Sequence, residues 1–93
     1  LPADEVIPTT VDLLDEFYRA ASRYAERQAQ AEIERVRLEE SQLLASGGLR
    51  GERITPNEVM LAEAHAREAL GEAEAARLEA WRVYYELLAL SGN

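Results

Sequence analysis

The feature that most constrains the fold is a run of ten apolar residues, spaced alternately three and four positions apart between residues 59 and 90. An average spacing of about 3.5 residues places such a set on one side of an α-helix and is typical of a coiled coil. Six consecutive members, from the second to the seventh, are all alanine, which lets a second helix approach closely. We call this set the hairpin seam: Val59, Ala62, Ala66, Ala69, Ala73, Ala76, Ala80, Val83, Leu87 and Leu90.

The start of this helix is marked by several agreeing signals. Thr55 is placed to act as N-cap, Pro56 falls at the first helical position, and Glu58 comes three residues after the cap. Ser or Thr followed three residues later by Glu is a capping box, and Pro is favoured at the first position. The helix is therefore predicted over residues 56–90, ending before "SGN".

A first helix is predicted over residues 10–45, with Thr9 as its cap. Two prolines in the first eight residues favour an extended arm over 1–8. Gly47 or Gly48 can supply the left-handed stop, and 46–55 form a loop. The prediction is a single all-α domain over 1–93, an antiparallel two-helix hairpin completed into a bundle by oligomerisation or by a partner.

The first helix carries an apolar stripe with a period near 3.6, which we expect to face the hairpin seam. Its members are Val11, Leu14, Tyr18, Ala21, Ala25, Ala29, Ile33, Val36 and Leu43. Both stripes have alanine at their centres, so the two small-residue zones meet when the helices fold back on each other.

A second apolar face lies away from these stripes and gathers the aromatic residues at the open end of the hairpin. We expect it to be a protein interface, formed by Leu13, Phe17, Tyr24, Leu78, Trp81, Tyr85 and Leu88. A two-helix hairpin cannot cover both of its sides, so this face predicts a partner, either a second copy or a helix of another protein. The alternative is that the hairpin bends, or that the arm folds over these residues.

Charge excludes some partner classes. Eighteen acidic residues against ten basic ones give a net charge of −8, the wrong sign for binding nucleic acid or an anionic lipid surface. No apolar run approaches the roughly 18 residues of a membrane span. Cysteine is absent, which excludes disulfides and thiolate metal sites. Because the chain begins with Leu1, we expect a processed product or a fragment, and its localisation stays open.

Residues suited to catalysis are scarce. His65 is the only histidine, and Glu68 follows one turn later, but no second histidine could complete a metal site within one chain. Acidic pairs such as Glu39 and Glu40 are typical of a solvated helix face. We expect no enzyme activity, no cofactor and no metal. A metal-dependent enzyme using His65 and Glu68 across a symmetric interface is the remaining catalytic alternative.

The stretch from "EESQLLASGG" to "YYELLALSG" resembles the last helical part of TolC-like outer-membrane efflux factors. In that family a long helix ends in a glycine-bearing turn, and an alanine heptad leads to a final Leu-x-x-Leu-x-Gly. Here the turn corresponds to Gly47 and Gly48 and the ending to Leu87, Leu90 and Gly92. The resemblance implies a piece or a helix-only relative of a transport component. The turn is longer than is usual in the family.

The chain is also similar in size and acidity to small secreted helical hairpins that pair into four-helix bundles, although their Trp-x-Gly turn is missing. The function expected from all these features is non-enzymatic and structural: lateral packing through the aromatic end into an oligomer or complex. A helical adaptor for a different protein is the alternative.

Overall fold

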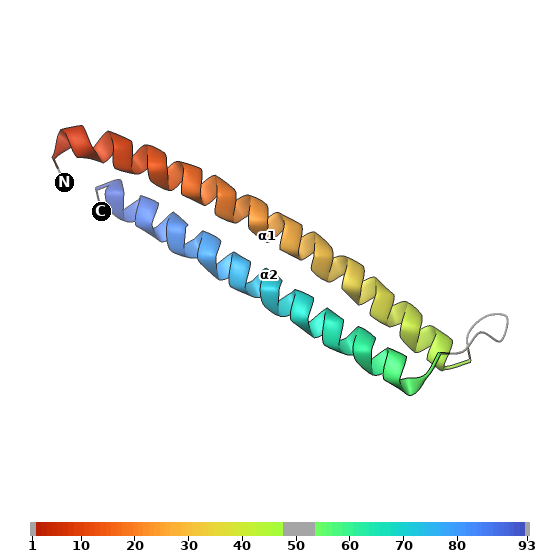
Figure 1. Cartoon of the computed structure of the whole chain (residues 1–93). Helices are drawn as coiled ribbons and strands as arrows, with labels where there is room; N and C mark the ends of the chain where they lie inside the picture. The colour runs from red at the N-terminus through yellow and green to blue at the C-terminus, as the bar shows by residue number, and fades with distance from the viewer. Residues whose placement is uncertain (1, 48–53, 93) are drawn as a thin grey trace.

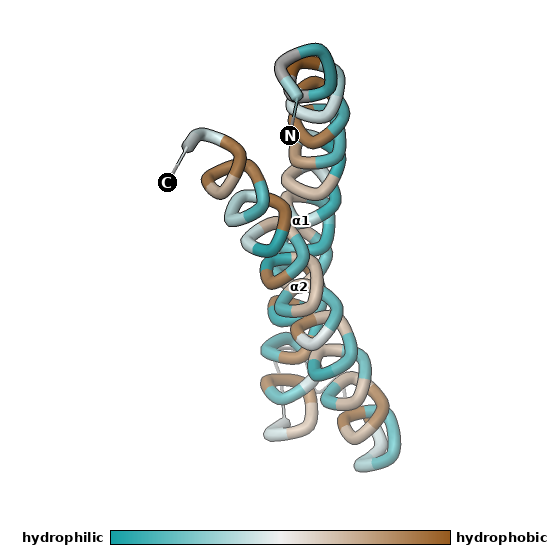
Figure 2. Tube along the Cα trace, turned by 90° about the vertical axis from the view of Figure 1, so that its left-hand side faces the viewer, coloured by the Kyte–Doolittle hydropathy of each residue, from teal (hydrophilic) through white to brown (hydrophobic). Residues whose placement is uncertain are grey.

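The computed structural model describes residues 2–47 and 54–92, which form two antiparallel helices, α1 (Ala3–Ala45) and α2 (Pro56–Leu90). The chain is a thin rod of 69 × 16 × 16 Å, with both termini at one end (Figure 1). The predicted all-α hairpin is confirmed. The helices cross, and hydrophobic residues recur along the length of each (Figure 2).

Helix α2 has the predicted boundaries. The Thr55 hydroxyl accepts a hydrogen bond from the Glu58 backbone N–H at 3.2 Å, and Pro56 is the first helical residue. This bond satisfies one of the amides that every helix leaves unpaired at its start. Ser91 caps the other end, where Gly92 has a positive φ of 94°.

Helix α1 ends where predicted but begins earlier. Gly47 takes the left-handed conformation with φ 113°, and its N–H bonds to the Leu44 carbonyl at 3.2 Å. Gly48 and the loop residues up to 53 lie outside the described residues.

The predicted arm over 1–8 and the Thr9 cap are wrong, because α1 starts at Ala3 and Pro8 lies inside it. Pro8 is the sixth residue of the helix and lacks the N–H that would bond to the Asp4 carbonyl, so the helix continues through its second turn with one backbone hydrogen bond fewer. Asp4 and Glu5 in the first turn also favour helix there by interacting with the positive end of the helix dipole.

All ten residues of the hairpin seam are buried or half-buried against α1. Of the residues whose burial the structure describes, five are buried: Ala20, Ala69, Ala73, Ala76 and Val83. The most buried part of the interior is therefore narrow and rich in alanine.

The stripe predicted to face this seam from the first helix is wrong. Eight of its nine residues are exposed, and only Ala21 is half-buried. The side of α1 that contacts α2 instead carries residues spaced alternately four and three positions apart: Leu13, Phe17, Ala20, Tyr24, Arg27, Ala31, Glu34, Leu38 and Ser41. This is a heptad, and it stays in step with the heptad of α2 along the hairpin, whereas a 3.6 period drifts away from it.

Candidate interaction surfaces

The aromatic rings form one cluster at the open end. Phe17 of α1 lies 6.2 Å from Tyr84 of α2, measured between ring centroids, and links the two helices. Trp81 lies 5.5 Å from Tyr84 and stacks on Tyr85 at 5.7 Å. Offset and edge-to-face pairs at these separations are favourable arrangements. The cluster therefore holds the open end of the hairpin together and continues onto its outer surface.

The predicted interface residues of α2 are indeed exposed. Trp81 is 45% exposed and Tyr85 62% exposed, and Leu78 and Leu88 lie beside them on the outer side. We call these four residues the α2 aromatic face. Large apolar side chains rarely gather on a solvated helix surface without a partner.

The predicted interface residues of α1 lie elsewhere. Leu13, Phe17 and Tyr24 are half-buried members of the heptad that contacts α2, not of a separate outer face. The sequence analysis placed them on an outer face because it took the more apolar stripe of α1 as the side that contacts α2. Phe17 and Tyr24 still reach the surface, where they line an apolar groove of about 310 Å³ with Ala80, Trp81 and Tyr84, and Arg77 at its edge.

The stripe of α1 that was predicted to face α2 lies on the outside of the hairpin, with all its members but Ala21 exposed, and Ile7 of the predicted arm extends it. We call it the α1 outer stripe: Ile7, Val11, Leu14, Tyr18, Ala21, Ala25, Ala29, Ile33, Val36 and Leu43. Ile7 is 71% exposed and Tyr18 66% exposed. At 100° per residue the stripe lies roughly 150° from the side that contacts α2. It therefore points away from the hairpin along nearly the whole helix.

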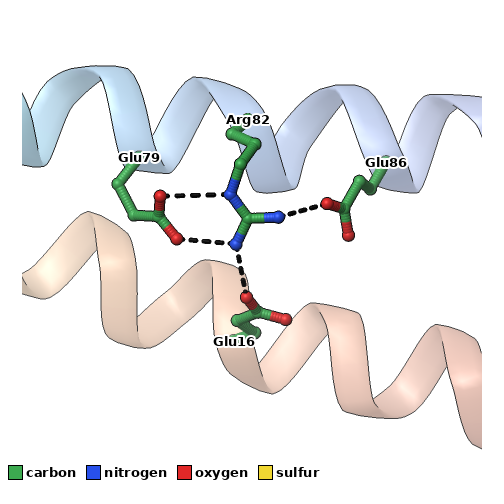
Figure 3. Close-up of polar contacts among 4 residues, drawn as sticks. All are labelled: Glu16, Glu79, Arg82 and Glu86. Atoms are coloured by element: carbon green, nitrogen blue, oxygen red, sulfur yellow. Dashed lines mark hydrogen bonds and ion pairs between the residues drawn. The ribbon is translucent and has the colours of Figure 1, made fainter.

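Ion pairs join the two helices at two levels. Arg82 of α2 bonds to Glu16 of α1 at 2.8 Å and also contacts Glu79 and Glu86 of its own helix (Figure 3). Arg27 of α1 lies 2.9 Å from Glu72 of α2. These side chains are about half exposed, so the pairs add little stability. Their role is to favour one register of α1 against α2.

Three of the carboxylates beside arginine have a lowered pKa. Hydrogen bonds from Arg82 hold the pKa of Glu79 below its usual value, and Arg35 and Arg77 do the same for Glu32 and Glu74. A carboxylate with a lowered pKa is a poor proton donor near neutral pH. These groups therefore fit a solvated, ion-paired surface.

His65 and Glu68 both lie on an exposed part of α2, next to an open depression that Glu34 and Glu72 also line. Within residues 2–47 and 54–92, no three His, Cys, Asp or Glu side chains converge as a metal site requires. Over the same residues, neither helix has a stretch long and apolar enough to cross a membrane.

No protein-family model, curated protein or solved structure matches this chain. The resemblance to TolC-like efflux factors stays a prediction.

Proposed function

We propose that the protein is a non-enzymatic structural subunit, which packs laterally through apolar surfaces on the outside of the hairpin into an oligomer or a larger helical assembly. The observation that carries this proposal is an inversion of the usual distribution of apolar side chains. The buried residues among those described are four alanines and one valine, whereas fifteen large hydrophobic residues are exposed.

The energetics favour association. Burying one large apolar side chain completely is worth about 1.5–3 kcal/mol relative to leaving it in water. The α2 aromatic face offers four such side chains side by side, and Trp and Tyr are the residues that most often anchor interfaces. A chain of this length buries only about 60–65% of its unfolded surface by itself, so a partner adds substantially to its stability.

A second candidate is an adaptor that holds a helix of a different protein. The apolar groove lined by Phe17, Tyr24 and Trp81 favours this candidate, because helix-in-groove recognition uses aromatic and aliphatic side chains between two helices. The two candidates differ in the pure chain: self-assembly predicts a defined oligomer, and an adaptor predicts a monomer with an exposed groove.

The test is light scattering coupled to size-exclusion chromatography over a tenfold range of concentration. We expect a defined oligomer, and we expect Trp81→Ala to weaken association by at least about 2 kcal/mol, as loss of an interface anchor does. Leu61→Ala is the control, since Leu61 is also an exposed large hydrophobic residue but lies near the loop end. Unchanged association of Trp81→Ala would show that the α2 aromatic face is not a contact surface.

A further inference from the structure

Several residues of the α1 outer stripe occur in pairs at equal sequence distances on either side of Ala25. This spacing plays no part in the packing of α1 against α2. Ile7 and Leu43 each lie 18 residues from Ala25, Leu14 and Val36 each lie 11, and Ala21 and Ala29 each lie 4. Bulky residues therefore occupy both ends of the stripe at matched distances, with alanine in the middle. Val11, Tyr18 and Ile33 are exceptions, because the positions at the matching distances are Glu39, Glu32 and Phe17.

Such symmetry is what a helix needs in order to pair with a copy of itself running in the opposite direction. In a two-fold symmetric contact, residue i meets residue j and residue j meets residue i. With the axis at Ala25, the alanine zones face each other, and each bulky end meets the opposite bulky end.

Charge decides between the antiparallel and parallel directions. The first 18 residues contain five acidic residues and no basic one, so two copies side by side in parallel would place these ends together. In the antiparallel direction, Asp15 comes near Arg37, because they lie 10 and 12 residues from Ala25 on the same edge of the stripe. Asp15 and Arg37 are exposed, and each pairs with a neighbour of opposite charge on α1. At this pair the antiparallel direction adds an attraction, whereas the parallel direction brings the two acidic ends together.

The available area is sufficient for a dimer. Helix α1 has 43 residues, which makes it about 64 Å long, and a helix is about 10 Å wide with its side chains. Contact along this length buries roughly 600 Å² on each copy, or about 1,200 Å² in total, which reaches the range of specific interfaces.

We propose that the α1 outer stripe pairs with the same stripe of a second copy of this chain, antiparallel and about a two-fold axis at Ala25. This inference rests on the proposed structural function and names the partner as the chain itself. Because the stripe points away from α2, the two central helices are α1 of each copy, and the two α2 helices lie outside. The α2 aromatic faces stay available for further contacts.

The experiment uses single-cysteine variants of the full chain, which contains no cysteine of its own. Ala25→Cys should form a disulfide-linked dimer under mild oxidation, because the two copies of residue 25 meet at the axis. Leu14→Cys alone and Val36→Cys alone should not cross-link, whereas an equimolar mixture of the two should. Ala75→Cys, at an exposed position of α2, is the control. We expect at least a tenfold excess of covalent dimer over this control for Ala25→Cys and for the mixture.

Each other outcome overturns the inference in a distinguishable way. Cross-linking of Leu14→Cys with itself and Val36→Cys with itself would show a parallel pair. If the native chain is an oligomer that Trp81→Ala dissociates, and no cysteine variant cross-links, this pairing is overturned. The proposed function is then still supported. A monomer at every concentration that also fails to cross-link would overturn both self-assembly and the pairing.

Discussion

At the scale of single residues, the hairpin depends on side chains that are small. Ala73 is only 2% exposed, and Ala69 and Ala76 are buried one turn on either side of it. Alanine has the highest helix propensity and loses no side-chain entropy on folding. It also lets two helices pack at a short distance between their axes. The zone of buried alanines in α2 therefore favours the helix and sets its distance from α1.

Ala73→Leu tests this role of small size. The larger side chain has no room in the seam, so we expect the free energy of unfolding to fall by about 1–3 kcal/mol through overpacking. Thermal unfolding followed by circular dichroism measures the change. Ala75→Leu is the matched control, because Ala75 is exposed on the same helix and should tolerate leucine with little effect. Equal stability of the two variants would contradict a tightly packed seam.

At the scale of the helices, the sequence predicts α2 almost completely, because its signals agree with one another. The capping box at Thr55, the heptad of the hairpin seam and the final glycine all point to the same bounds, which the structure has. In α1 the signals conflict. Two prolines suggested an arm, yet the helix tolerates Pro8 and begins at Ala3.

The sequence also did not predict which side of α1 packs against α2. The correct heptad includes Arg27 and Glu34, so it looks less apolar than the stripe on the opposite side. Arg27 reaches Glu72 across the seam, and Glu34 pairs with Arg37 at 3.0 Å, so both charges are satisfied at its edge. Apolar content alone therefore selects the wrong side, whereas matching the period of α1 to that of α2 selects the right one.

Replacing a glycine by alanine should change the stability of the hairpin in opposite directions at Gly47 and at Gly71. Gly47 ends α1 with φ 113°, where a Cβ is strained, so Gly47→Ala should destabilise the hairpin by about 1 kcal/mol. Gly71 lies inside α2 with nothing within 4 Å of the position of a Cβ. Gly71→Ala should stabilise it by about 0.5–1 kcal/mol. Urea unfolding of both variants measures the two changes, and effects of the same sign would contradict these conformations.

At the scale of the whole molecule, the rod has a long surface and little interior. A thickness of 16 Å by Cα positions leaves space for one line of contacts between two helices. Side chains that would form the core of a thicker bundle lie outside it, on the α1 outer stripe and the α2 aromatic face. The stability of such a chain is therefore expected to depend on association, and association makes stability depend on concentration.

The melting temperature should thus rise with protein concentration. A tenfold change in concentration is worth about 1.4 kcal/mol in an association equilibrium, which for a dimer of this size shifts the melting temperature by about 3–5 °C. Calorimetry or circular dichroism over a hundredfold range of concentration measures the slope. Tyr18→Glu introduces a charge into the α1 outer stripe and should reduce this dependence. Leu61→Glu places the same charge at an exposed apolar position near the loop and should preserve it. A melting temperature independent of concentration in the native chain would mean that the hairpin is stable by its narrow alanine seam alone.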